Sequence, residues 1–202
     1  RRYTAPSGWL RAIDTTTGAE VASCDLGGQP DSIAISKDGA FLSIAIENER
    51  DEDLNDGAMP QMPAGNLVMI NTTKDGLDCA NMTLVDMTGL AEVAPSDPEP
   101  EFVSINSLGE TIVTLQENNH LVVVTRDGSI LNHFSAGAVD LDGIDATDER
   151  GKLIFTESQQ GRKRQPDAVT WIDDHNFPIP NAGDYHGGSR GRTHFKQRSN
   201  SV

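Results

Sequence analysis

The sequence predicts an all-β fold, because apolar and polar residues alternate over short spans that are separated by Gly, Asp and Asn. Such alternation is typical of half-buried strands, and the separating residues are typical of turns. The candidate strands are residues 31–36, 41–46, 66–71, 101–106, 111–116, 120–125, 152–157 and 167–172. No stretch of a dozen residues has a clear helical period, and the best candidate, residues 83–94, is interrupted by Gly89.

A proline followed by a carboxylate and an alternating strand occurs three times. The copies are QPDSIAIS at 29–36, EPEFVSIN at 99–106 and QPDAVTWI at 165–172. Each copy continues through a turn and a second strand to an asparagine, which is Asn48, Asn118 or Asn181. Proline suits the first residue of a strand because it fixes φ and donates no ladder hydrogen bond. We therefore expect each copy to supply the first two strands of a repeating unit.

A second motif lies between the proline copies and completes the unit. It occurs as WLRAIDTTTG at 9–18, NLVMINTTKDG at 66–76 and HLVVVTRDG at 120–128, and it has a Leu-x-x-Ile/Val pattern before a turn. Repeating units of four short antiparallel strands are typical of β-propeller blades. The sequence thus predicts a β-propeller with about three four-stranded blades present, and residues 142–158 look like an inserted hairpin.

The number of units predicts that the propeller is larger than this segment. Propellers typically contain about four to eight blades, and an open stack would leave strand edges unpaired. We expect residues 1–202 to be a single propeller segment whose first and last blades are incomplete. The missing blades would come from the same polypeptide or from other protein chains.

The charge of the chain argues against one class of partner. It has 31 acidic and 16 basic side chains, and its formal net charge is −15. Nucleic-acid binding depends on clustered Lys and Arg that neutralise phosphates, so no nucleic-acid partner is expected. No apolar run approaches the roughly 20 residues of a membrane-spanning helix, and we expect no membrane span in this segment.

Several features favour an extracellular or cell-surface location. Asn71 and Asn81 each begin an N-glycosylation sequon, which predicts attached glycans. Cys24 and Cys79 fall in equivalent outer strands of neighbouring units, where a disulfide could join them. Two buried free thiols are the alternative interpretation of the same cysteines.

Two groups of carboxylates are candidate ligands for Ca²⁺, an ion that binds oxygen atoms. The first group belongs to the acidic loop ENERDEDLNDG and comprises Glu47, Glu49, Asp51, Asp53 and Asp56. The second group follows the repeated prolines, would converge on the propeller axis, and comprises Asp31, Glu101 and Asp167. The alternatives are a solvated loop for the first group, and turn capping or pairing with arginines such as Arg164 for the second.

The stretch DYHGGSRGRTH at 184–194 is a candidate phosphate-binding loop. Backbone N–H groups of a glycine-rich loop and arginine guanidinium groups can together hold a phosphate. The side chains concerned would be His186, as an acid, and Ser189, Arg190 and Arg192. An ordinary loop between blades accounts for the same residues. No Gly-x-Ser-x-Gly nucleophile motif occurs in the sequence.

Four segments, FVSINSLGETIVTLQENNHLVVV, AVDLDGIDATDE, QPDAVTWI and NAGDYHGGSRG, resemble the choice-of-anchor I propellers. That family includes mesenchyme-specific cell-surface glycoproteins and secreted propellers labelled alkaline phosphatase or phytase-like. The resemblance extends from about residue 8 to about residue 195 and implies a longer secreted or surface-anchored propeller. The chain departs from the family at Ala182, where a glutamate is usual, and in its tail FKQRSNSV.

These observations predict a secreted or cell-surface β-propeller that serves as a binding or structural scaffold in an extracellular assembly. The long loops 47–65 and 86–99 would face the partner. The alternative is a Ca²⁺-dependent phosphoesterase, in which the carboxylates hold the metal ion and Arg190 and Arg192 orient the phosphate. The alanine at 182 and the lack of an evident nucleophile argue against this alternative.

Overall fold

The computed structural model describes residues 4–51, 53–74, 76–145 and 151–182. Within these residues the regular structure is almost entirely strand, and the helices are two single 3-10 turns, η1 (Asn55–Gly57) and η2 (Cys79–Asn81). The best helical candidate of the sequence, residues 83–94, forms a short strand followed by turns and bends. The all-β prediction is therefore confirmed.

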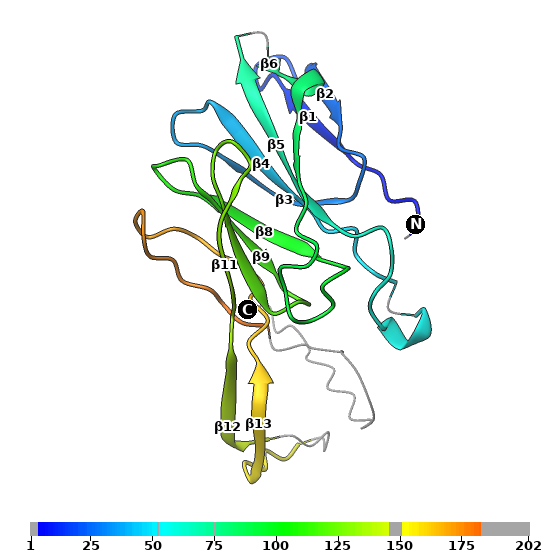
Figure 1. The fold of residues 1–202 in the computed structure, drawn as a ribbon, viewed down its shortest axis with the longest axis vertical. Coiled ribbons are helices and arrows are strands. Elements are labelled where there is room, and N and C mark those ends of the chain that lie inside the picture. The colour runs from blue at the N-terminus through cyan, green and yellow to red at the C-terminus, as the bar shows by residue number, and fades with distance from the viewer. Residues whose placement is uncertain (1–3, 52, 75, 146–150, 183–202) are drawn as a thin grey trace.

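Two antiparallel sheets form the centre of the molecule (Figure 1). The strands of the first sheet are β3 (Pro30–Ile35), β4 (Phe41–Ile46), β5 (Asn66–Thr73), β6 (Gly76–Leu77) and β7 (Thr83–Val85), and both β6 and β7 pair with β5. The strands of the second sheet, in spatial order, are β8 (Pro100–Ile105), β9 (Thr111–Leu115), β10 (His120–Val124) and β11 (Ile130–Ser135). Each sheet combines one proline copy with one Leu-x-x-Ile/Val copy, as predicted for a blade.

The sheets stack face to face, and apolar side chains fill the space between them. A two-stranded sheet, β1 (Trp9–Ile13) and β2 (Glu20–Asp25), packs on one face of the first central sheet through Cys24 and Leu26. The same face carries Ile44, Ile46, Val68 and Ile70. The alternate residues Ala45, Leu67 and Met69 face the other way, toward Val103, Val113 and Val122 of the second central sheet. Because side chains alternate along a strand, both faces of this sheet are buried.

The third proline copy packs on the outer face of the second central sheet but does not form regular strands. Its strand-like contact is an isolated bridge between Pro166 and Asn181, and Val169 is buried beside Ile112 and Leu121. The strand predicted at 167–172 is therefore wrong. The returning segment contains Pro178 and Pro180, which lack the N–H groups that a continuous ladder requires.

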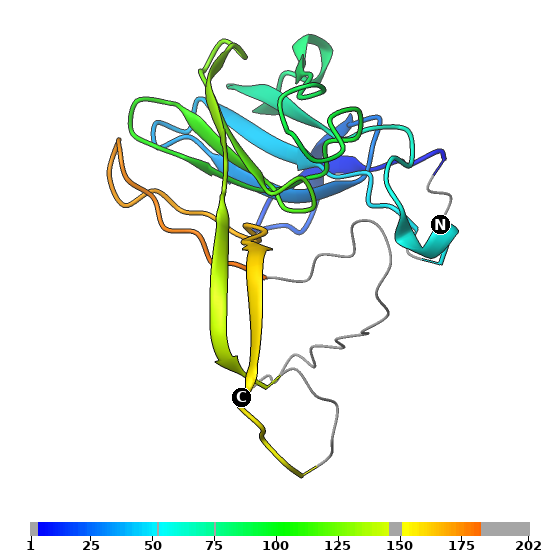
Figure 2. The same ribbon diagram turned by 60° about the horizontal axis from the view of Figure 1, so that its bottom comes forward.

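A hairpin of β12 (Ala138–Ile144) and β13 (Glu157–Lys163) points away from the stacked sheets (Figures 1 and 2). This hairpin confirms the predicted insertion, although its second strand begins at Glu157 and the strand predicted at 152–157 is wrong. The apolar residues Leu153 and Phe155, which suggested that strand, lie exposed before it. The sequence of β13, ESQQGRK, does not alternate between apolar and polar residues, because neither face of this strand packs on the core.

A disulfide joins Cys24 of β2 to Cys79 of η2, and it closes a sequence separation of 55 residues. It connects the two-stranded sheet to the neighbouring central sheet, so the predicted pairing is confirmed. Both sequon asparagines, Asn71 and Asn81, are exposed. In the described part of the chain, no helix has the length and apolar character that a membrane crossing needs.

Candidate functional site

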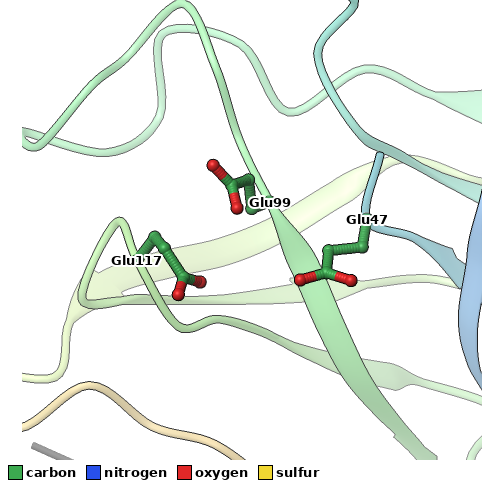
Figure 3. Close-up of side chains that lie close together, drawn as sticks. All are labelled: Glu47, Glu99 and Glu117. Atoms are coloured by element: carbon green, nitrogen blue, oxygen red, sulfur yellow. The ribbon is translucent and has the colours of Figure 1, made fainter. Parts of the chain in front are cut away.

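A cluster of glutamates lies at the edge where β8 begins and where β4 and β9 end. Glu47 follows directly on β4, Glu99 precedes Pro100 at the start of β8, and Glu117 comes two residues after β9. Figure 3 shows the three carboxyl groups arranged as a triangle, with that of Glu99 above those of Glu47 and Glu117. One carboxylate oxygen from each residue lies within 4.8 Å of the other two.

The repeated asparagines explain why the chain brings these residues together. The side-chain Oδ1 of Asn118 accepts a hydrogen bond of 2.9 Å from the backbone N–H of Glu99, the residue before the repeated proline. In the first copy, Oδ1 of Asn48 accepts the equivalent bond of 2.8 Å from the N–H of Gln29. Each asparagine therefore fixes the start of the first strand of its own sheet, β3 or β8. The residue that precedes each asparagine, Glu47 or Glu117, is held beside that start.

Arg50 is the cation of the cluster. Its Nη1 lies 3.1 Å from Oε2 of Glu99 and 3.3 Å from Oε1 of Glu117. Its Nε donates a hydrogen bond of 3.1 Å to the carbonyl oxygen of Gly57 in the acidic loop. The guanidinium group is buried and joins the loop after β4 to the second central sheet. Three carboxylates and one guanidinium carry a formal net charge of −2.

Glu99 is the most deeply buried carboxylate of the cluster, with 1% of the residue exposed. Its Oε2 contacts Arg50, whereas its Oε1 is buried with no hydrogen-bond partner. Burial, and after it the negative charge of Glu117, raises the pKa of Glu99 to about 8, and Arg50 opposes this change. A buried carboxylate oxygen without a partner is costly, because the group has lost its hydration.

Glu101 and Asp167, two of the predicted axial carboxylates, lie together beside this cluster. Burial is the largest cause that raises the pKa of Glu101 to about 9, followed by the charges of Glu117, Asp167 and Glu47 and a hydrogen bond to Asp167. Asp31, the third predicted axial residue, is exposed at the start of β3. The first proline copy thus places Glu47, from the end of its second strand, beside Glu101.

The acidic loop after β4 is organised around an uncharged side chain. Oε1 of Gln61 accepts a hydrogen bond of 3.0 Å from the N–H of Asp51, and its Nε2 donates to the carbonyl of the same residue at 3.0 Å. Oδ1 of Asp51 accepts from the N–H of Asp53 at 3.0 Å, and both residues are exposed. Glu49 accepts a hydrogen bond of 3.3 Å from Nε2 of Gln29. Among these loop residues, only Glu47 is part of the described cluster.

Two parts of the sequence-based predictions fall outside the described structure. The candidate phosphate-binding residues His186, Ser189, Arg190 and Arg192 lie outside the described residues. The side chain of Asp56 is likewise outside what the structure describes. The phosphoesterase alternative gains no structural support from the residues that are described.

A protein-family comparison finds a match to the choice-of-anchor I domain over residues 6–176. The chain belongs to the choice-of-anchor I domain family. The resemblance inferred from the sequence is thereby confirmed. No curated protein sequence matches the chain.

Comparison with solved structures shows that this choice-of-anchor I domain has the β-propeller fold. The Swd1 β-propeller domain of Myceliophteria thermophila has a TM-score of 0.52 and 13% identity, over 87% of this chain and 44% of that one. A hydrazine synthase of Kuenenia stuttgartiensis has a TM-score of 0.49 and 9% identity, over 87% of this chain and 52% of that one. The chain therefore spans about half the length of these solved chains.

Sequence reasoning missed Arg50, Glu99 and Glu117, although the repeat marks the positions of Glu99 and Glu117. The sequence prediction followed the carboxylates that come after each proline. In the choice-of-anchor I domain, the clustered glutamates instead precede a repeated residue: Glu99 precedes Pro100, Glu117 precedes Asn118 and Glu47 precedes Asn48. Alignment of the two complete copies places Glu47 and Glu117 at the same position of the repeat. No comparable pattern marks Arg50.

Proposed function

We propose that this choice-of-anchor I domain is part of a secreted or cell-surface protein, in which the propeller is a rigid scaffold that binds a partner in an extracellular assembly. The propeller fold and the family membership fit such a role. The Cys24–Cys79 disulfide fits an oxidising compartment, since disulfides rarely persist in reducing cytosol. The exposed sequon residues Asn71 and Asn81 are accessible for glycan attachment.

The observation that carries the proposal is the way in which the two long loops are fixed to each other. The N–H of Gln61 donates a hydrogen bond of 2.7 Å to the buried Oδ2 of Asp97, and the N–H of Gly65 donates one of 2.8 Å to the carbonyl of Pro98. Nδ2 of Asn118 donates to the carbonyl of Asp97 at 2.9 Å. Loops 47–65 and 86–99 therefore form one preorganised surface. A surface that is already ordered loses less conformational entropy when it binds a partner.

Met62 offers a direct test of this surface, because it lies in the first loop with 55% of the residue exposed. Chemical crosslinking on intact cells that produce the protein should trap adducts between the wild-type protein and an external partner. The Met62→Asp variant should lose these adducts, because a charge replaces an apolar contact at the surface. Surface biotinylation of the same intact cells should label the protein.

Leu108→Asp is the matched control for the crosslinking experiment. Leu108 has 61% of its surface exposed but lies in the turn after β8, at the opposite end of the strand from Glu99. This variant should retain the wild-type adducts. Equal adducts in both variants would count against the loops as the binding surface, and a protein that biotin cannot reach on intact cells would count against the proposed location.

A further inference from the structure

We propose that Glu47, Glu99 and Glu117 bind one divalent cation, Ca²⁺, which bridges the two central sheets of the propeller. Glu47 belongs to the end of the first sheet, and the other two residues belong to the second. Ca²⁺ binding at these residues does not depend on the scaffold function, because it involves a different set of atoms and a different ligand.

The spacing of the three carboxylates suits one ion. Their nearest oxygen atoms lie within 4.8 Å of one another. Ca²⁺–oxygen distances are about 2.3–2.6 Å, so two ligand oxygens on opposite sides of the ion are about 5 Å apart. A calcium ion can therefore contact all three side chains with the backbone where it is (Figure 3).

The buried oxygen of Glu99 is the observation that points to a ligand rather than to a crowded acidic surface. Glu99 is 1% exposed, one of its carboxylate oxygens lies within 4.8 Å of an oxygen of each of the other two glutamates, and its Oε1 is buried with no hydrogen-bond partner. Acidic side chains on a surface are hydrated, whereas this oxygen is out of contact with water. A cation at this position would supply the missing partner.

The ion pairs of Arg50 leave carboxylate oxygens that a Ca²⁺ ion can bind in addition. Its Nη1 contacts Oε2 of Glu99 and Oε1 of Glu117, so one oxygen atom of each carboxylate is used by the guanidinium group. When all three carboxylates are ionised, as Ca²⁺ binding requires, they and Arg50 together carry a charge of −2, which equals the charge that one Ca²⁺ ion neutralises. Ca²⁺ and the guanidinium would then occupy different oxygens of the same carboxylates.

The chemical nature of the ligands favours Ca²⁺ over other common ions. All three ligands are carboxylate oxygens, which suit hard cations, whereas zinc and copper sites use histidine and cysteine. Mg²⁺ requires nearly ideal octahedral geometry at about 2.0–2.1 Å and gives up its water reluctantly. The three ligands come from two sheets, and each lies just beyond the end of a strand. Such ligands are better suited to the variable coordination of Ca²⁺.

The test is a titration of the chelator-treated protein with CaCl₂ by isothermal calorimetry, at constant ionic strength. The wild-type protein should bind one ion per chain. Glu47→Gln should weaken this binding at least about tenfold, since a charged ligand is replaced by a neutral one. Glu47 is half-buried, whereas Glu99 is 1% exposed, so substitution of Glu47 should disturb folding less than substitution of Glu99.

Glu49→Gln is the matched control, because it removes the same charge two residues away. Glu49 shares the hydrogen-bond donor Gln29 with Glu47 but is not among the clustered carboxylates. This variant should keep wild-type affinity. Glu99→Gln, with its fold checked by circular dichroism, should also lose binding. A flat CaCl₂ titration of the wild type, equal affinities in Glu47→Gln and Glu49→Gln, or tighter binding of MgCl₂ than of CaCl₂ would overturn the proposal.

Discussion

At the scale of single residues, two asparagines determine where the acidic cluster forms. Asn48 and Asn118 each accept a hydrogen bond from the residue before a repeated proline. Asn48 also donates to the carbonyl of Ala64 in loop 47–65, and Asn118 donates to the carbonyl of Asp97 in loop 86–99. The sequence showed these residues at a constant interval from the prolines, but their role is visible only in the structure. Spacing along a chain does not say which side-chain atoms meet when strands pair.

Asn118→Ala should destabilise the protein by about 2 kcal/mol or more, because it leaves the buried N–H of Glu99 and the carbonyl of Asp97 without their partner. Urea unfolding followed by circular dichroism measures this change. Asn132→Ala is the control, since Asn132 is exposed on β11. A loss of stability that is equal in both variants would contradict the role of Asn118.

His120 predicts how the stability of the protein depends on pH. Burial, together with the neighbouring His133, lowers the pKa of His120, and Glu92 opposes this change. Above the ordinary histidine pKa, both the folded and the unfolded forms are neutral. Below it, the unfolded chain takes up the proton first, so the free energy of unfolding decreases as pH falls from about 6.5 toward the folded-state pKa.

His120→Gln should therefore lose less stability than the wild type between about pH 7.5 and 5.5 in urea titrations. His175→Gln replaces an exposed histidine and should follow the wild-type profile. If His120→Gln lost as much stability on acidification as the wild type did, the assigned cause would be wrong.

At the scale of elements, the sequence predicted well those strands that pack on the core. Each of the strands β4, β5, β9 and β10 contains four or five consecutive buried residues, and the apolar residues among them reveal these strands in the sequence. The alternation of apolar residues predicted strands wrongly in segments whose structure does not depend on packing against the core. Apolar residues of 152–157 lie exposed beside the projecting hairpin, and the partner segment of 167–172 carries Pro178 and Pro180, which cannot donate to a ladder.

The projecting hairpin should be dispensable for the fold. Arg164 donates a backbone hydrogen bond of 3.3 Å to the carbonyl of Gly137, so the two ends of the insertion are adjacent. Replacement of residues 138–163 by a short Gly-Ser linker should leave the melting temperature close to that of the wild type. Differential scanning calorimetry measures it. A large decrease in melting temperature would show that the hairpin supports the stacked sheets.

At the scale of the whole molecule, the structure is a stack of sheets whose contacts include apolar layers, one disulfide and the polar edge that contains Arg50. The repeat in the sequence predicted the stacking and the pairing of Cys24 with Cys79. It also predicted Glu101 and Asp167 as candidate site residues, whereas the density of carboxylates in the acidic loop predicted Glu47. Glu99 and Glu117 were missed, because a carboxylate that precedes a strand or follows one reaches the edge only through the register of the whole sheet.

Replacement of both Cys24 and Cys79 by alanine should lower the free energy of unfolding by up to about 4 kcal/mol, because the closed loop limits the unfolded chain. Denaturant unfolding of the oxidised wild type and the double variant measures this difference. A thiol titration of the unfolded wild type should detect no free cysteine. Two reactive thiols, or equal stability of the two proteins, would contradict a structural disulfide.

The most direct test of the acidic edge is a crystal structure of the protein grown with CaCl₂. Electron density for one ion should lie in contact with carboxylate oxygens of Glu47, Glu99 and Glu117, at distances of about 2.3–2.6 Å. Arg50 should remain paired with Glu99 and Glu117. Density for water alone between the three side chains, or carboxyl groups that have turned apart in the presence of the ion, would contradict the account.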